Sequence, residues 1–245
     1  MTGKEATYYD KLYFERRDYE YTSKYPSFML MAQYLVRTYS PKKTLDIGFG
    51  KGAFFVRAML ELGRDAYGVD ISEYAILSAP KKIRNRLYRV DANSDIMPFE
   101  NNSFDMVTAF RLYEHIKNLV HLTTEIIRVL NNNGVLFVTV PTIWNIKKGK
   151  ILRSVFPLFR EISPNLDRPS LNYSVLTKRA WIEHFEQQGF IYLGLFPRDI
   201  WKKVISSPKP GTVIGEILKN RGLNFVREEI AFLFDWFVPL IFKKK

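Results

Sequence analysis

Residues Leu45–Gly52 read LDIGFGKG, and this short stretch decides the fold. An acid, Asp46, stands in an apolar run, and three glycines follow at every second position. Glycine permits positive φ and lets backbone approach a ligand closely. The apolar KTLDI before the turn predicts a strand, and residues 52–62 after it predict a helix with one apolar face. The stretch therefore predicts a strand–turn–helix ligand site, with helix amides facing the ligand.

Apolar strands and helical segments alternate on both sides of this turn. This alternation predicts an α/β fold: a doubly wound, Rossmann-like, mostly parallel seven-stranded sheet with helices on both faces. The helix after the second strand is expected to begin at an N-cap, Ser72, and a later one at Thr177. The seven predicted strands are 43–47, 65–70, 86–90, 104–110, 135–140, 190–196 and 201–206.

Three regions are predicted along the chain. Residues 1–40 form an N-terminal helical cap with a break at Pro26, 41–207 form the ligand-binding domain, and 208–245 form a C-terminal helical extension. Within the domain, four prolines interrupt the alternation over 141–176. We interpret that segment as an insertion over the carboxyl edge of the sheet, on the substrate side.

Composition limits the class of protein and the chemistry. The 245 residues are 47% hydrophobic, which is enough for one substantial core. The absence of cysteine excludes disulfides, thiolate metal sites and a cysteine nucleophile. His115, His121 and His184 lack the spacing of metal ligands, so no metal is expected. The polar, charged N-terminus indicates no secretory signal, and we expect a cytoplasmic protein.

Positive charge gathers in the last part of the chain. Residues 141–245 hold 18 basic and 9 acidic residues, hence +9 of the net +12. Such a surface suits phosphate, lipid headgroups or nucleic acid, or it is simply a solvated surface. The apolar stretch 230–242, followed by three lysines, is too short to cross a bilayer. It is interpreted either as peripheral membrane contact, or as a helix docked on the domain or on a dimer partner; the sequence indicates no oligomeric state.

Two classes of ligand fit the glycine turn. Gly48, Gly50 and Ala53 match the dinucleotide pattern G-x-G-x-x-G/A, and Asp70 lies 22 residues beyond Gly48, so NAD is one candidate. Asp46 favours a different ligand, because a carboxylate repels a pyrophosphate and attracts a cation. S-adenosylmethionine carries a sulfonium and an ammonium, and it suits a site with this acid.

The ordered motifs resemble those of class I S-adenosylmethionine-dependent methyltransferases. Within that class the chain is most similar to the ubiquinone- and menaquinone-biosynthesis group (methyltransferase type 11). LDIGFGKG resembles the D-x-G-x-G-x-G motif, and YGVDIS resembles the family's second strand, which ends in an acid. VDANSDIMPFENNSFDMV resembles the third and fourth motifs together, and AFRLYEHIKN resembles the segment that ends in E-H. EIIRVLNNNGVLFVTVP resembles the helix–turn–strand block, and WIEHFEQQGF resembles the family's late helix. The resemblance covers residues 40–145 well and 176–197 weakly. It departs from the family at Asn131–Asn133 and at Arg111.

The resemblance implies S-adenosylmethionine as cofactor and S-adenosylhomocysteine as product. It implies that Asp70 accepts hydrogen bonds from both ribose hydroxyls, and that Asp91 and Ala92 contact the adenine amino group. Asp70 and Asp91 could instead be turn acids, and Ile71 packs either on adenine or in the core. The implied cofactor-binding residues are Asp46, Gly48, Phe49, Gly50, Gly52, Asp70, Ile71, Asp91, Ala92 and Phe110.

Catalytic candidates are few, because methyl transfer mainly requires positioning of the acceptor. His115 is a candidate general base, although the recurrence of E-H in the family favours a structural role for it. Arg111 is a candidate for substrate recognition. Aromatic residues near the N-terminus either cap the cofactor, by cation–π attraction, or pack as an outer helix. They are Tyr8, Tyr9, Tyr13 and Phe14.

The predicted reaction moves a methyl group to an oxygen, nitrogen or carbon atom of a small-molecule or lipid-type acceptor. No D/N-P-P-Y/F loop follows the fourth strand, which reads into AFRLYEH, and there is no cysteine, so nucleic-acid bases are disfavoured as acceptors. Two alternatives stay open. One is an RNA- or glycan-directed methyltransferase, and the other is a non-catalytic subunit that binds S-adenosylmethionine.

Overall fold

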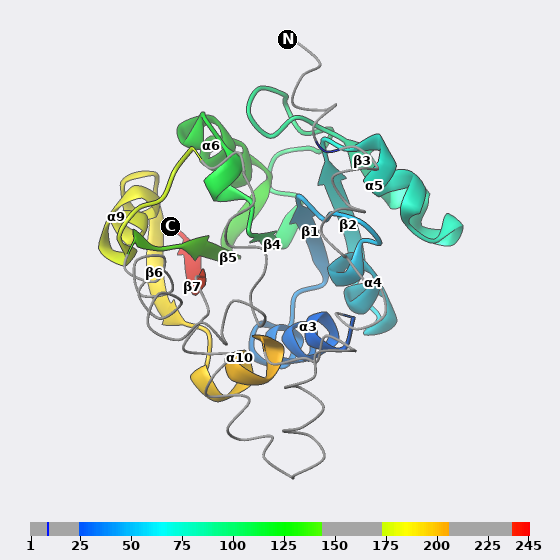
Figure 1. The fold of residues 1–245 in the computed structure, drawn as a ribbon, viewed down its shortest axis with the longest axis horizontal. Helices are drawn as coiled ribbons and strands as arrows, with labels where there is room; N and C mark the ends of the chain where they lie inside the picture. Colours follow the sequence, from blue (N-terminus) through cyan, green and yellow to red (C-terminus); the bar gives the residue numbers. More distant parts are fainter. Residues whose placement is uncertain (1–8, 10–24, 144–172, 206–236) are drawn as a thin grey trace, which may run out of the picture.

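The computed structural model describes Tyr9 and residues 25–143, 173–205 and 237–245, and every structural statement below concerns these residues (Figure 1). The helices are α3 (Tyr25–Tyr39), α4 (Phe54–Glu61), α5 (Glu73–Ser78), the 3₁₀ turns η1 (Lys81–Arg86) and η2 (Tyr113–His115), α6 (Leu119–Val129), α9 (Lys178–Gln187) and α10 (Arg198–Ile205). The strands are β1 (Lys43–Ile47), β2 (Asp65–Asp70), β3 (Leu87–Arg89), β4 (Phe104–Phe110), β5 (Leu130–Pro141), β6 (Phe190–Leu195) and β7 (Phe237–Lys244).

The strands form one sheet in the order β3-β2-β1-β4-β5-β7-β6 (Figure 1). The pairings from β3 to β5 are all parallel, and β7 runs antiparallel to both of its neighbours, β5 and β6. This confirms the predicted α/β architecture with a mostly parallel seven-stranded sheet. Since the parallel strands share one direction, their carboxyl ends meet at a single edge, where open α/β sheets bind ligands.

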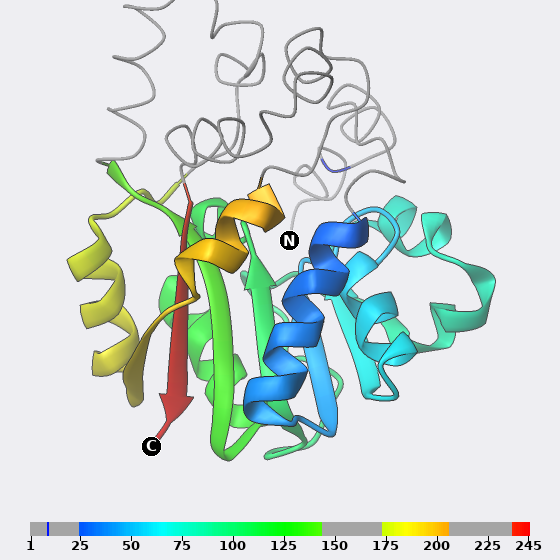
Figure 2. The same cartoon turned by 90° about the horizontal axis from the view of Figure 1, so that it is seen from below.

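Helices cover both faces of the sheet, as predicted. In Figure 2, α3 and α10 lie on the near face and α6 lies behind the sheet. The first face packs α3, α4, α5 and α10 around buried residues such as Phe55 and Phe137. The second face packs α6 and α9 around Trp181, Phe185 and Phe242, whose side chains are fully buried. Because both faces are covered, most strands are apolar on both sides.

The predicted C-terminal helical extension is wrong for residues 237–245. Phe237–Lys244 is a strand, and it fills the place between β5 and β6. Leu240 and Phe242 are fully buried there. The apolar run is explained by burial on both faces of a sheet, because an inner strand needs no polar side.

The segment 201–206 does not supply the seventh strand either. Residues 198–205 form the helix α10, in which Trp201 and Val204 are buried and Lys203 is exposed. Burial at positions three residues apart is the spacing of one helix face.

The burial of β7 also bears on the membrane interpretation of the apolar tail. Residues 237–242 belong to the sheet, so in this fold they offer no apolar helix to a membrane, and residues 230–236 lie outside the described part. No described helix is both long and apolar enough to span a bilayer.

The N-terminal and inserted regions are described only in part. Pro26 stands in the first turn of α3 as the structure describes it, where its missing N–H costs nothing, and the predicted break there involves residues before Tyr25 that lie outside the described part. Apart from Tyr9, residues 1–24 lie outside the described residues, as does most of the 141–176 insertion. The predicted turn at Asn131–Gly134 is a bulge in β5, where the register shifts between Leu130 and Val135.

Lys244, the last residue of β7, hydrogen-bonds to the C-terminal end of α6. Its Nζ donates to the carbonyls of Ile127 (2.8 Å) and Leu130 (2.6 Å) and to Asn102 Oδ1 (2.9 Å). A cation at a helix C-terminus is stabilised by the helix dipole. These bonds explain why a lysine ends this strand, whose first six residues are apolar.

Replacing Lys244 by methionine is therefore expected to lower the free energy of unfolding by about 1–3 kcal/mol, because three carbonyl acceptors lose their donor. Methionine keeps most of the apolar stem. Urea unfolding measures the change, and Lys245→Met, at an exposed position, is the matched control. Equal stability of the two variants would contradict the role of Lys244.

Candidate cofactor site

The glycine turn joins β1 to α4 at the carboxyl edge of the sheet. Gly48, Gly50 and Gly52 all have positive φ, at 70°, 61° and 86°, and Ala53 follows at 47°. A Cβ at Gly48 would lie 3.0 Å from Leu112 Cδ1, whereas a Cβ at Gly50 would meet no atom within 4 Å. The glycines are thus required by the backbone, and at Gly50 the turn faces open space that a ligand can use.

Asp70, the last residue of β2, holds the glycine turn from across the edge. Its Oδ2 accepts from Gly50 N (2.8 Å) and its Oδ1 accepts from Ser72 N (2.9 Å). Burial raises the pKa of Asp70 to about 6, against the opposing effect of these backbone bonds. A carboxylate offers about four lone-pair sites, so each oxygen keeps capacity for a further donor. The arrangement fits the predicted bonds to two ribose hydroxyls, and it also serves the turn itself.

Ser72 caps α5, as the sequence predicts, by accepting from Ala75 N at 3.1 Å. Its hydroxyl also donates to the carbonyl of Tyr9 at 2.6 Å. Ser72, two residues after Asp70, thus connects the sheet edge to Tyr9.

Asp46 is buried beside the turn, with 2% of its surface exposed. Its Oδ1 accepts from Thr108 Oγ1 at 2.6 Å, and Thr108 lies directly opposite it on β4. Burial raises the pKa of Asp46 to about 8, the Thr108 bond opposes this, and the nearby charge of Asp70 adds to it. A buried acid without a cation prefers its neutral form, and a bound cation would favour ionisation. The site therefore favours a positively charged ligand.

Phe49 contributes its backbone to the turn and its ring to the core. The ring is 8% exposed, and a Cβ at Gly68 on β2 would lie 2.7 Å from its Cδ1. Gly68 thus makes room for Phe49, which anchors the turn on the sheet. The predicted contact of Phe49 with the cofactor can only be through main-chain atoms or the ring edge.

The predicted adenine contacts lie on the loop after β3. Asp91 Oδ1 accepts from Asn93 N (2.9 Å) and Asn93 Nδ2 (3.2 Å), and Asp95 Oδ2 accepts from Asp91 N (2.9 Å). These bonds are those of a turn acid. Ala92 and Ile71 are half-buried, the latter on the loop after β2. Their roles toward adenine stay predictions.

Phe110 and Arg111, at the end of β4, have different surroundings. The half-buried Phe110 ring packs against Phe28, Phe55 and Phe137, with centroids 5.4, 5.0 and 5.4 Å away. Arg111 is exposed and has φ 53°.

Glu114 and His115 form the turn η2 and do not open α6, whose N-cap is Asn118. Glu114 is buried, and its carbonyl accepts from Tyr173 N at 2.7 Å. His115 Nε2 lies 3.7 Å from Glu114 Oε1, and its ring meets that of Tyr9 edge-on at 6.0 Å. Glu114 thus connects η2 to Tyr173 through its carbonyl, and His115 brings an imidazole to the edge; the structural role expected for the pair stays a prediction.

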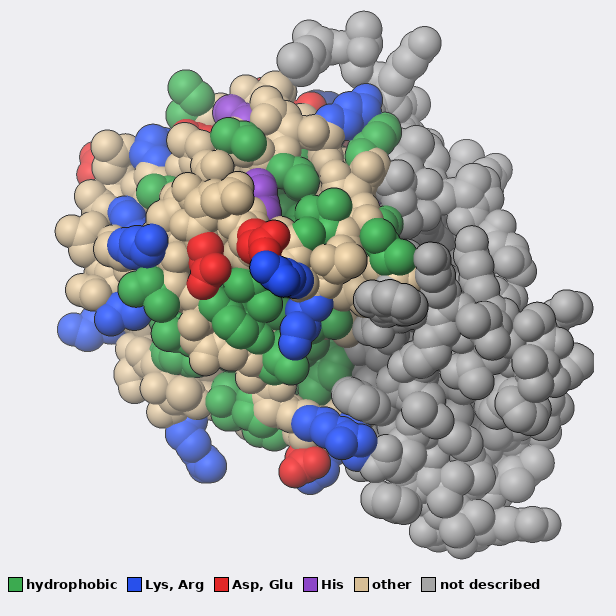
Figure 3. Space-filling model, turned by 90° about the vertical axis from the view of Figure 1, so that its left-hand side faces the viewer, with side chains coloured by type: hydrophobic (Ala, Val, Ile, Leu, Met, Phe, Trp, Pro, Cys, Tyr) green, Lys and Arg blue, Asp and Glu red, His purple; other side chains and the backbone are tan. Residues whose placement is uncertain are grey.

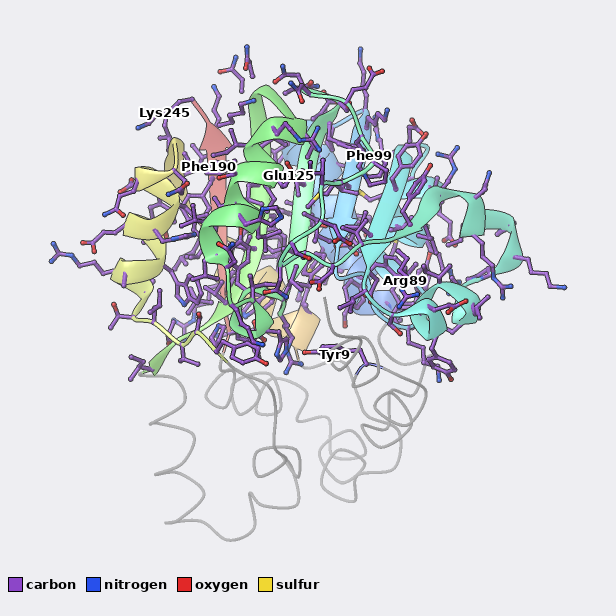
Figure 4. All side chains as sticks on the ribbon, turned by 90° about the horizontal axis from the view of Figure 1, so that it is seen from above. Tyr9, Arg89, Phe99, Glu125, Phe190 and Lys245 are labelled. Carbon is purple, nitrogen blue, oxygen red and sulfur yellow. The ribbon has the colours of Figure 1, made fainter. Side chains whose placement is uncertain are left out.

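Tyr9 is the one member of the predicted aromatic cap that the structure describes. Figure 4 shows it at the end of the sheet opposite to Lys245, hence at the carboxyl edge. Its contacts with Ser72 and His115 place it between the loops that follow β2 and β4. Tyr8, Tyr13 and Phe14 lie outside the described residues.

The other histidines bond locally. His121 Nε2 lies 3.2 Å from the Asp95 carbonyl, and His184 Nε2 lies 3.0 Å from Thr123 Oγ1. Within the described ranges, no three histidine, aspartate or glutamate side chains gather as metal ligands would. Two useful partners escaped the sequence analysis, Thr108 for Asp46 and Thr139 for Arg111; the visible signal was a threonine inside each apolar strand.

Comparison with known proteins agrees with this geometry. A family profile described as a methyltransferase domain matches residues 45–138. An uncharacterised protein of Methanocaldococcus jannaschii is 27% identical over 212 residues, covering 80% of this chain and 83% of that protein. A malonyl-[acyl-carrier protein] O-methyltransferase of Legionella pneumophila is 34% identical over 103 residues, covering 41% of this chain and 36% of that protein.

A solved structure shares the fold. The crystal structure of an S-adenosylmethionine-dependent methyltransferase from Archaeoglobus fulgidus is 17% identical, with a TM-score of 0.59, and the match covers 96% of this chain and all of that one.

The site fits S-adenosylmethionine on its own chemistry. The open face at Gly50 accepts a ligand against the backbone, the buried acid Asp46 favours a cation, and Asp70 keeps acceptor capacity for hydroxyls. A dinucleotide pyrophosphate would meet two buried carboxyl groups instead. Together with the methyltransferase domain matched over residues 45–138, these features are those of an S-adenosylmethionine-dependent methyltransferase site.

Proposed function

We propose that this methyltransferase acts on a small-molecule or lipid-type acceptor, at an oxygen, nitrogen or carbon atom. The small-molecule class is supported by the relative named for a malonyl-[acyl-carrier protein] acceptor. When bound, S-adenosylmethionine supplies an activated methyl group on a sulfonium. The observation that carries the proposal is the open glycine turn at Gly50, bordered by the buried acids Asp46 and Asp70.

The chain's own residues then have to hold the acceptor in line and keep water out. Positioning of this kind can contribute up to roughly 7–11 kcal/mol in ideal cases. Tyr9, Arg111 and His115 border the carboxyl edge on the acceptor side. For an oxygen or nitrogen acceptor, we assign to His115 the role of the base that takes the proton that the acceptor loses; this is supported by Glu114 Oε1, which lies 3.7 Å from His115 Nε2.

The test is methyl transfer from labelled S-adenosylmethionine into a source-cell extract, followed by partition between organic and aqueous phases. Enzyme-dependent label in the organic phase would support a lipid-type acceptor. Label in the aqueous phase would indicate a small polar metabolite, and its sensitivity to nuclease or glycosidase would identify the RNA- or glycan-directed alternative. Binding of S-adenosylmethionine without any transfer would favour the non-catalytic subunit.

Replacing Tyr9 by alanine is expected to weaken S-adenosylmethionine binding between about twofold and thirtyfold, the range of a cation–π contact between exposed and desolvated settings. The backbone bond from Ser72 to the Tyr9 carbonyl is kept in this variant. Calorimetric titration gives the dissociation constant, and Tyr9→Phe, which keeps the ring, is the control. Wild-type affinity in Tyr9→Ala would assign Tyr9 to packing alone.

A further inference from the structure

Arg111 adopts a backbone conformation that its side chain does not explain. Its φ of 53° lies in the left-handed region, which favours glycine. The backbone is fixed there, since Arg111 N donates to Thr139 Oγ1 (2.9 Å) and to the Thr139 carbonyl (3.2 Å) on β5. Backbone strain of this kind tends to persist at functional sites. A long charged residue where glycine would be easier indicates that the side chain has a use.

The guanidinium of Arg111 lies over an aromatic ring at the acceptor side of the edge. Its Cζ is 4.2 Å from the centroid of Phe237, the first residue of β7. Because β7 is antiparallel, it begins where β5 ends, and Phe237 pairs with Pro141. The position of β7 beside β5 thus brings the ring of Phe237 under Arg111.

The ring contact of Arg111 does not use up the hydrogen-bond donors of its guanidinium. Stacking uses the flat face of the group, while its N–H donors point outward in the plane. None of the described ion pairs includes Arg111, and the side chain is exposed. An arginine held by an aromatic ring and not by a carboxylate is prepared for an anion from outside.

Lys117, a second cation on the loop after β4, also lies over an aromatic ring. Lys117 Nζ lies 4.7 Å from the centroid of Tyr173. The loop after β4 therefore carries two cations over aromatic rings, whereas the acids Asp46 and Asp70 lie beside the glycine turn. Positive charge on the acceptor side and negative charge on the cofactor side form a polarised site.

We propose that Arg111 binds an anionic group of the methyl acceptor, a carboxylate or a phosphate, against the ring of Phe237. This rests on the proposed function and deepens it: the acceptor is an anion, and Arg111 selects it. Guanidinium matches both groups by two parallel hydrogen bonds.

The test uses Arg111→Gly, because glycine suits the backbone at this φ and removes only the side chain. Malonate and inorganic pyrophosphate serve as probes, titrated calorimetrically into the full chain saturated with S-adenosylhomocysteine. We expect saturable binding of one probe, weakened about tenfold or more in Arg111→Gly and partly restored in Arg111→Lys. The melting temperature should be unchanged or higher, and S-adenosylhomocysteine affinity unchanged. The preferred probe distinguishes a carboxylate from a phosphate.

Two controls separate this site from the general positive charge of the protein. Lys82→Gln removes one exposed cation on η1, and Asn133→Gly relieves a φ of 66° at the bulge in β5. Both should bind the probe as the wild type does. Absence of probe binding, or equal losses in Arg111→Gly and Lys82→Gln, would overturn the proposal. Failure of methyl transfer would contradict the proposed function alone, because probe binding needs no transfer.

Discussion

Asparagine in place of Asp70 is expected to weaken S-adenosylmethionine binding at least tenfold. Hydrogen bonds to a charged group contribute about 1.5–3 kcal/mol each, and about 1.4 kcal/mol is a factor of ten in affinity. The side-chain amide of asparagine also replaces one of the two acceptor oxygens of Asp70 by an N–H donor. That donor would face Gly50 N or Ser72 N, the two backbone donors that now bond to Asp70. Asp70→Asn therefore loses acceptor sites for the ligand and, at the same time, a bond that orders the glycine turn.

The measurement is the dissociation constant from calorimetric titration, compared with that of Asp105→Asn. Asp105 is a matched control, because its carboxylate accepts from Lys42 N and Lys43 N, both at 2.9 Å, near the start of β1. That variant should lose stability and keep its affinity for the cofactor. An unchanged dissociation constant in Asp70→Asn would reject the role of Asp70, and equal loss in both variants would assign the effect to folding.

The central strands could be predicted almost to the residue. KTLDI, DAYGVD and FDMVTAF are short apolar runs that end at glycine, acid or turn signals, and they became β1, β2 and β4 with the expected bounds. The caps at Ser72 and Thr177 were equally visible, because a side-chain acceptor before a helix is a local signal. Local chemistry is sufficient for these elements.

The C-terminal strand could not be predicted for a physical reason. Pro239 stands inside β7, where proline argues against an inner strand, and its neighbours are apolar on both faces. The position of β7 between β5 and β6 depends on pairing with residues about one hundred and about fifty positions away. No local pattern encodes such a pairing.

The edge strand β6, which pairs with β7, shows the same limit of prediction from sequence. Ile191, Leu193 and Leu195 are 45–49% exposed on β6. Figure 3, which faces the α9–β6 side, shows hydrophobic side chains among charged ones. The apolar run FIYLGLF predicted a strand correctly, but because both sets of alternate residues are apolar it did not predict which face would be covered.

At the site, the sequence indicated the residues but not their partners. The glycines and acids follow from a motif, whereas the bond from Thr108 to Asp46 and that from Arg111 to Thr139 depend on register between neighbouring strands. The positive φ of Arg111 is equally invisible in a sequence. Burial in the fold raises the pKa values of Asp46 and Asp70, and the cross-strand bond from Thr108 opposes the rise at Asp46.

Asparagine in place of Asp46 is expected to have two opposite effects. Binding of S-adenosylmethionine should weaken about tenfold or more at pH 8.5, because the buried site loses the charge that attracts a cation. The protein without cofactor should become more stable at the same pH. The folded-state pKa of Asp46, about 8, lies above the usual value of 3.8, so ionising this acid costs the folded chain on the order of a few kcal/mol.

The sign of the pH dependence follows from proton binding. Between pH 4 and pH 8 the folded chain holds a proton on Asp46 that the unfolded chain has lost, so this acid makes stability fall as pH rises. Cofactor affinity should change in the other direction and rise through the same range, as Asp46 ionises. Both slopes should be smaller in Asp46→Asn, with Asp70, whose pKa is raised to about 6, accounting for the remainder at lower pH.

Thermal unfolding and cofactor titration from pH 5 to pH 9 would test both slopes on the same samples. Thr108→Val is the informative companion, because it removes the 2.6 Å bond that favours the ionised form of Asp46 and should move the affinity rise to higher pH. If Asp46→Asn kept the wild-type pH profile of affinity while gaining stability, Asp46 would be a buried structural acid. If Thr108→Val shifts the pH profile of cofactor affinity and Asp46→Asn flattens it, the carboxylate of Asp46 is the group that attracts the cation.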